Sequence, residues 1–210
     1  MTKKKFLMAS IVGVLCIVFV SAVKADVNVG MTVTDEGLRN FYFSIGEFFR
    51  TPEKEVMVVR QQGIPDEEIA VIYFLSQRAN VPPGQIIKWR VHNRWTWMKI
   101  ASKLKLSPEI FYVRIDEPVT GGVYGRIYKY YQQPRDRWKK IKLTDEEIVH
   151  CVNLHFISGY YGYKPVEVIK MRNSGKNFVV INNEIKVKKQ HGEKKVIHKK
   201  TTKYEKGKHR

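Results

Sequence analysis

The chain has 210 residues, of which 38 are Lys or Arg and 20 are Asp or Glu, giving a formal net charge of +18. Aromatic residues make up 12% of the sequence, which favours a folded protein over a disordered one. There are only two cysteines, Cys16 and Cys151, so a disulfide-rich scaffold is excluded. The charge is uneven, because residues 186–210 hold eleven Lys or Arg and only two Glu, whereas residues 26–185 carry a net charge of only +5.

The N-terminal segment has the three parts of an export signal. Lys3, Lys4 and Lys5 precede an uncharged apolar run, and Val23 and Ala25 occupy the small-residue positions that a signal peptidase reads. We expect cleavage after Ala25, which removes residues 1–25 as a signal peptide and places the mature chain in the periplasm or cell envelope. The alternative is an anchor in the inner membrane formed by residues 6–23, a length at the lower limit for crossing a bilayer.

Residues 26–115 are predicted to form an N-terminal helical unit. Thr34 marks a helix start, and apolar residues between Leu38 and Phe49 then recur at steps of three and four, which is typical of one face of an amphipathic helix. A second helix is predicted at residues 52–62, with Pro in its first turn and Gly63 after its end.

Three further helices are predicted in the same unit. The first spans residues 65–79 and contains seven consecutive apolar residues from Ile69 to Leu75, for which a buried strand is the competing interpretation. The acidic start and the length of this segment favour the helix. Shorter helices are expected to begin at Pro82 and at Arg94.

The second half of the chain is divided by composition. Residues 116–136 are rich in Gly and Tyr, and we interpret them as a connector or an ordered aromatic loop. A second helical unit is predicted at residues 137–185, where Thr144 and Glu147 have the spacing of a capping box. Residues 186–210 are roughly half charged with few apolar residues, and we expect them to form a disordered basic tail.

A weak internal repeat relates the two units. The order and spacing of several residues recur with an offset of about 80 positions. Asp66-Glu67-Glu68-Ile69 reappears as Asp145-Glu146-Glu147-Ile148, then Pro83, Ile87, Lys88 and Arg90 as Pro165, Ile169, Lys170 and Arg172, and Trp97 and Ile100 as Phe178 and Ile181. The sequence thus predicts a mainly α protein with two related helical units. The alternative to a duplication is that acidic helix starts recur by chance.

Three segments of the chain are similar to an uncharacterised group of small secreted bacterial proteins. These are Gly63-Ile64-Pro65-Asp66-Glu67-Glu68-Ile69, Pro108-Glu109-Ile110-Phe111-Tyr112-Val113 and Phe156-Ile157-Ser158, and the resemblance covers most of residues 37–185. It implies bacterial export and a helical body. That group brings no known activity, so no functional residue carries over.

One cluster of residue types has the composition of a reactive site. His150, Cys151 and His155 lie close in sequence, but residues five apart on a helix point about 140° apart, so the two histidines do not share a face. Zinc sites on helices use steps of three or four residues, so we expect no metal and no cofactor. We interpret Cys151 as a buried small hydrophobe, the alternative being a reactive thiol or one that pairs between chains.

Two other patterns have simpler structural interpretations. The acidic runs Asp66–Glu68 and Asp145–Glu147 stand at predicted helix starts, where negative charge is stabilised by the helix dipole. Residues 83–104 resemble a helix-turn-helix with cations facing outward, but that arrangement is also ordinary helix packing, and the export signal argues against nucleic acid as a partner.

We therefore expect an exported, non-enzymatic protein that acts by interaction with a protein or another envelope partner. The candidate contact aromatics are Trp89, Trp95, Trp97 and the tyrosines between Tyr124 and Tyr131, with core packing favoured for the tryptophans. The alternative is binding of a polyanion, an anionic lipid or a cell-wall polymer through the basic tail. Its expected contacts are Lys188, Lys189, Lys194, Lys195, Lys199, Lys200 and Lys203. No small-molecule substrate is identified, and an enzyme of unknown class has little support.

Overall fold

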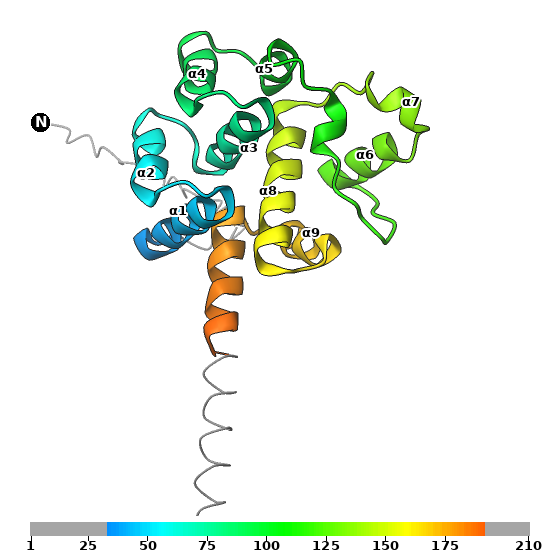
Figure 1. The fold of residues 1–210 in the computed structure, drawn as a ribbon. Helices are drawn as coiled ribbons and strands as arrows, with labels where there is room; N and C mark the ends of the chain where they lie inside the picture. Colours follow the sequence, from blue (N-terminus) through cyan, green and yellow to red (C-terminus); the bar gives the residue numbers. More distant parts are fainter. Residues whose placement is uncertain (1–32, 192–210) are drawn as a thin grey trace, which may run out of the picture.

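The computed structural model describes residues 33–191 of the chain (Figure 1). The predicted signal peptide and most of the predicted tail lie outside these residues. Within them every regular element is a helix, which confirms the mainly α prediction. The helices are α1 (Asp35–Phe49), α2 (Glu53–Gln61), α3 (Ile69–Ala79), α4 (Pro83–Ile87), α5 (Trp97–Lys103), α6 (Gly122–Tyr131), α7 (Arg135–Trp138), α8 (Asp145–Tyr161), α9 (Pro165–Asn173) and a last helix that includes residues 178–191.

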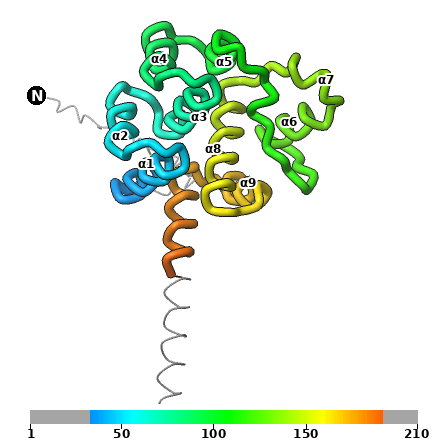
Figure 2. The backbone as a smooth tube through the Cα atoms, in the orientation of Figure 1, coloured from blue at the N-terminus to red at the C-terminus, as the bar shows by residue number. Residues whose placement is uncertain are grey.

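Helix α8 forms the centre of the fold. It contacts α1, α3, α5, α6 and α9, and the tube in Figure 2 shows it between the N-terminal helices and α6. Its buried residues include Ile148, Leu154, Phe156 and Ile157, which point in different directions around the helix. A helix with apolar residues on all sides must be covered on all sides, so the other elements pack around it.

The apolar segment Ile69–Leu75 is helical, and all seven of its side chains are buried in α3. The competing interpretation as a strand is wrong. Asp66–Glu68 forms one 3₁₀ turn before this helix, and Asn80, the residue after its end, adopts a left-handed conformation that terminates it.

Threonine side chains cap three of the helices. The hydroxyl of Thr34 accepts a hydrogen bond from the Gly37 N–H, and that of Thr96 accepts one from the Lys99 N–H. Thr144 and Glu147 form both bonds of the predicted capping box, which is confirmed.

Residues 122–131, which lie inside the expected connector, form helix α6. A loop is the wrong interpretation for this part, because Tyr124, Ile127 and Tyr131 are spaced as one helical face and are buried. The glycines serve the helix start: Gly121 has a φ of 76°, and a Cβ on Gly125 would meet the backbone of Thr120 at 3.0 Å.

The last helix corrects the predicted start of the disordered tail. Residues 186–191 are helical, because the buried Phe178, Ile181 and Ile185 fix the preceding turns against the body. The Lys186 ammonium donates a hydrogen bond to Asn40 Oδ1 over 2.7 Å. Within residues 33–191, no helix is both long enough and apolar enough to cross a membrane.

Candidate functional site

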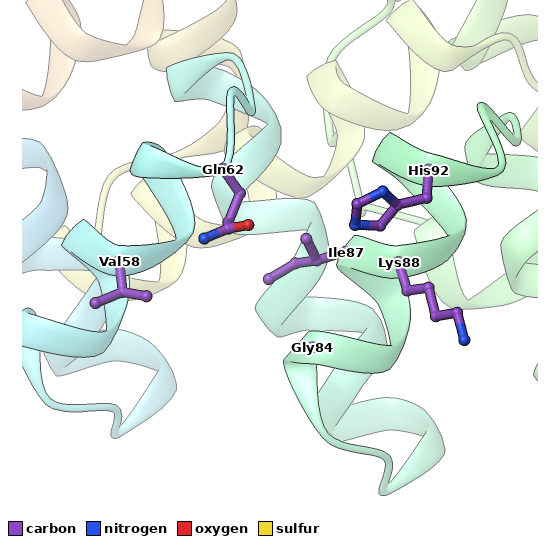
Figure 3. A pocket seen from close by; sticks show the side chains of 6 residues that line it. All are labelled: Val58, Gln62, Gly84, Ile87, Lys88 and His92. Carbon is purple, nitrogen blue, oxygen red and sulfur yellow. The ribbon is translucent and has the colours of Figure 1, made fainter.

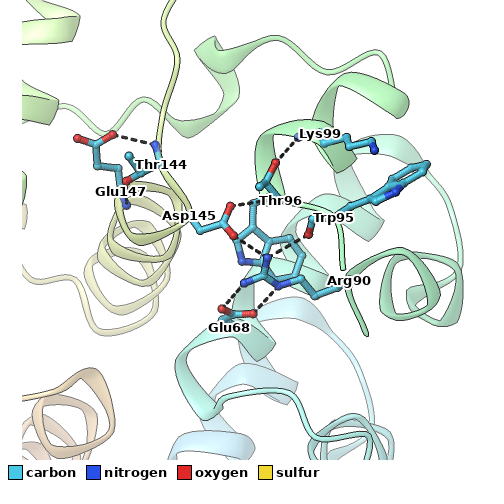
Figure 4. A network of polar contacts seen from close by, with 9 residues as sticks. Glu68, Arg90, Trp95, Thr96, Lys99, Thr144, Asp145 and Glu147 are labelled. Carbon is cyan, nitrogen blue, oxygen red and sulfur yellow. Dashed lines mark hydrogen bonds and ion pairs between the residues drawn. The ribbon is translucent and has the colours of Figure 1, made fainter. Parts of the chain in front are cut away.

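The densest polar network of the fold surrounds Arg90. The chain after α4 continues as a π-helical turn, Lys88–His92, which places the Arg90 guanidinium between the starts of two helices. Its Nε and Nη2 donate to the two carboxylate oxygens of Glu68 over 2.8 and 2.6 Å, and its Nη1 donates to Asp145 Oδ2 over 2.6 Å (Figure 4). Burial alone would lower the pKa of Arg90, but its bonds to Glu68 and Asp145 outweigh that effect and raise the pKa above its ordinary value.

The same network anchors the start of α5. The Arg90 guanidinium lies 4.6 Å from the ring centroid of Trp97, a cation–π contact, and Nη1 also donates to the Trp95 carbonyl. The second oxygen of Asp145 accepts the Trp97 backbone N–H over 2.8 Å. Asp145 therefore caps α5 from the start of α8, 48 positions further along the chain.

A second cluster of the same kind surrounds Arg172. Its guanidinium lies 5.3 Å from the ring centroid of Phe178, and its Nη1 donates to the Lys176 carbonyl over 2.9 Å. Glu67 stands 3.9 Å from Arg172 Nη2 and accepts the Phe178 backbone N–H over 2.6 Å. A carboxylate from the turn before α3 thus caps the last helix.

The carboxylates predicted to stabilise helix starts also brace neighbouring helices. Glu147 is buried, accepts from the Thr144 N–H and forms a 3.0 Å ion pair with Arg126 of α6. With Glu67, Glu68 and Asp145 engaged as described above, these acids act as structural anchors between elements.

His150 and His155 lie on different sides of α8. His150 packs against Tyr124 and Phe178 with ring centroids 5.1 and 5.5 Å away, whereas His155 packs near Phe48 on another side of α8. Burial, with smaller contributions from two arginines, lowers the pKa of His150 to about 4. Among residues 33–191, no group of three or more His, Cys, Asp or Glu side chains is arranged to hold a metal ion.

Cys151 is buried, as predicted from its apolar surroundings. Burial raises the pKa of its thiol, since the thiolate would lose its hydration, and the nearby Glu147 adds to the effect. The thiol is therefore neutral and enclosed in the folded protein.

An open hollow of about 550 Å³ lies between α2 and the π-helical turn (Figure 3). Val58 and Ile87 give it an apolar wall, and Lys88 and His92 stand on the side of the turn. Val58 itself is half exposed, as is the neighbouring Met57.

The predicted contact aromatics divide into two groups. Trp97 and Tyr124 are almost fully buried and belong to the core. Trp89 and Trp95 are half-buried and stacked, with ring centroids 5.7 Å apart, and the Lys99 ammonium lies 4.4 Å from the Trp95 centroid. The prediction of core packing is therefore confirmed for Trp97, whereas Trp89 and Trp95 are partly exposed at the surface.

Two of the predicted tail contacts fall in the described residues. Lys188 and Lys189 are exposed on the last helix, and the Lys189 ammonium donates to the Tyr161 carbonyl. The other five, Lys194, Lys195, Lys199, Lys200 and Lys203, lie outside the described residues.

Sequence reasoning missed a cationic surface on the body. Residues 126–142 contain seven Lys or Arg and one Asp, and thus carry more positive charge than the whole of residues 26–185 does on balance. The signal was the run from Arg135 to Lys142, which was overlooked because the tail dominates the charge count. In the fold these residues flank a hollow of about 660 Å³ lined by Tyr130, Gln133, Arg137, Lys140, Ile141 and Lys142.

Comparison with known proteins gives no further guide to the site: no family model, no curated protein and no solved structure matches this chain.

Proposed function

We propose that this chain is an exported, non-enzymatic protein that acts by binding a partner at the cell envelope, and that its body is a duplicated helical unit. The observation that carries the proposal is that the acidic, histidine and cysteine side chains that could perform chemistry are buried or occupied in structural contacts. Glu67, Glu68, Asp145 and Glu147 brace helices against one another, and His150 and Cys151 are enclosed as neutral groups. These residues stabilise a scaffold, which leaves the surface for recognition.

The two arginine clusters support the duplication. Arg90 covers Trp97 and bonds the carbonyl of the residue two positions before it, and Arg172 covers Phe178 and does the same. The backbone N–H of each aromatic residue donates to an acid from the acidic run of the other copy, Trp97 to Asp145 and Phe178 to Glu67, which lies one position after Asp66, the repeat equivalent of Asp145. Reciprocal contacts of this kind are what two copies of one unit make across a pseudo-twofold axis.

The order of the elements also supports the duplication. In each unit an acidic start leads into a long helix, then a helix that begins at Pro83 or Pro165, then a helix that begins at Trp97 or Phe178. The second unit keeps this order with a longer first helix. A shared ancestral unit explains both the order and the clusters.

Export rests on the sequence of residues 1–25, and its test is the mature N-terminus. The full chain is expressed in a bacterium, the cell is fractionated, and the intact mass of the product is measured. We expect a periplasmic or envelope-bound protein that begins at Asp26. A protein that keeps Met1 and stays in the cytoplasmic fraction would overturn the proposal, and one that keeps Met1 in the inner membrane would establish the anchored alternative.

A second candidate function is retention on anionic surfaces by the basic tail. It is favoured by Lys188, which is exposed on the last helix, and by the excess of cations in residues 186–210. Each cation close to an anionic membrane contributes about 1 kcal/mol, less at high salt. Replacing the seven tail lysines named above by Gln should strongly weaken retention on heparin at low salt, and unchanged retention would contradict this role.

A further inference from the structure

The hollow between α6 and α7 is built on a rigid aromatic base. Trp138 of α7 is buried, its ring centroid lies 4.7 Å from that of Tyr112 and 5.0 Å from that of Tyr131, and its indole N–H donates to the Gln133 carbonyl over 2.8 Å. Ile141 and Leu143 are buried next in the chain. These contacts fix the short α7 and the segment after it. The exposed side chains that alternate with the buried Trp138, Ile141 and Leu143 therefore point outward.

Three cations line this hollow, and they differ from the three arginines that brace neighbouring helices. Arg90, Arg126 and Arg172 are all engaged by carboxylates of the body. Arg137, Lys140 and Lys142 are exposed, form no ion pair with any described residue, and share the lining with no acid. Three exposed cations around one hollow give it a positive potential, which favours an anionic ligand.

The remaining lining residues indicate which anion fits. Tyr130 and Gln133 offer a hydroxyl and an amide, both able to donate hydrogen bonds, and Ile141 supplies an apolar surface. A planar guanidinium binds phosphate oxygens in pairs, and lysine ammonium groups bind them as point charges. The open hollow of about 660 Å³ has room for more than a phosphate ion, so a phosphate carried by a larger molecule also fits.

We propose that this hollow is a binding site for a phosphate-bearing ligand, with Arg137, Lys140 and Lys142 on the phosphate and Tyr130 and Gln133 at its edge. The site lies on the folded body and is distinct from the basic tail. The site would be where the protein makes the interaction proposed above, and a phosphate-bearing molecule would be its partner. Only the role of this binding in the cell rests on the proposed function.

The test compares two full-length variants with the same change in net charge. The site variant carries Arg137→Gln, Lys140→Gln and Lys142→Gln. The matched control carries Lys54→Gln, Lys88→Gln and Lys103→Gln, which remove three exposed cations elsewhere on the body. Inorganic phosphate is titrated into each protein while amide chemical shifts are followed by NMR, and binding to phosphatidylglycerol vesicles is measured against phosphatidylcholine vesicles.

We expect saturable shifts that centre on residues 130–142 in the wild type and the control, and at least about tenfold weaker binding in the site variant. If the site variant, but not the control, also loses retention on phosphatidylglycerol vesicles, a lipid headgroup is the source of the phosphate, whereas phosphate binding alone would identify a soluble ligand. The proposal is overturned if neither probe binds, or if the site and control variants lose binding equally. The tail variant distinguishes the two proposals, since it should leave the shifts at residues 130–142 unchanged even if it loses retention on heparin.

Discussion

Asp145 accepts a hydrogen bond from the backbone N–H of Trp97 over 2.8 Å, and this bond joins the first residue of α8 to the first residue of α5. The other oxygen of the same carboxylate accepts a hydrogen bond from Arg90 Nη1. One acid therefore fixes the direction of α5 relative to the central helix. The following predictions test how much of the fold depends on such contacts and on the buried groups around them.

Replacing Arg90 by Met should lower the free energy of unfolding by about 2–4 kcal/mol, because Glu68 and Asp145 would lose their partner in a largely shielded position. Denaturant unfolding followed by circular dichroism measures the change. The control is Arg114→Met, which removes an exposed ion pair with Asp116 and should cost less than about 1 kcal/mol. Equal losses in both variants would contradict the bracing role of Arg90.

Trp97 and Phe178 occupy matching places beneath Arg90 and Arg172, so a phenylalanine should be tolerated in the first cluster. Trp97→Phe keeps an aromatic ring under the guanidinium and removes an indole N–H that has no partner among the described residues. We expect a loss of about 1–2 kcal/mol, against about 3–5 kcal/mol for Trp97→Ala. If the two variants unfold at the same denaturant concentration, the ring has no role in the cluster.

Most of the helices could be predicted from the sequence, because their signals are local. Thr34 and Thr144 are capping residues that indicate helix starts. The spacing of the apolar residues from Leu38 to Phe49 indicates one buried face of a helix. The long apolar segment Ile69–Leu75 was ambiguous by pattern alone, and its acidic start and length gave the correct answer.

The errors arose where tertiary contacts decide. Tyr and Gly suggested a loop at α6, yet Tyr124, Ile127 and Tyr131 form a buried helical face, from which Tyr124 packs on His150 of α8. The boundary of the tail was placed too early because Lys186 looks like tail by composition, although Asn40 and Phe43 hold it against α1. The run of cations at the hollow was visible in the sequence, but which cations find a carboxylate was not, since Asp145 and Glu67 lie 55 and 105 positions from Arg90 and Arg172.

Cys151 should resist modification in the folded protein. Its thiol is buried and its pKa is raised, so the reactive thiolate is scarce and shielded. With Cys16→Ser present to leave one thiol, reaction with a disulfide reagent should be at least about 100-fold slower in buffer than in denaturant, since modification then requires an opening of the fold. A rate in buffer close to that of a free cysteine would show that the thiol is exposed.

His150 should make the protein less stable in mild acid. Its pKa is about 4 in the fold against an ordinary value of 6.5, so the native state keeps the ring neutral while the unfolded chain binds a proton. Above about pH 6.5 the ring is neutral in both states and does not reduce the free energy of unfolding. As the pH falls towards about 4, this free energy decreases, by at most about 3 kcal/mol. The charges that act on it are Arg172 and Arg126, which both disfavour the protonated ring.

The measurement is the free energy of unfolding from about pH 7 to about pH 4.5, compared between the wild type and His150→Leu. The variant lowers absolute stability through changed packing, so only the slope with pH is compared. Carboxylates titrate in the same range in both proteins, and their part cancels in the difference. His92→Leu is the control because His92 is exposed, and it should retain the wild-type slope. If His150→Leu retains that slope too, the ring is accessible to protons in the native state and does not link folding to pH.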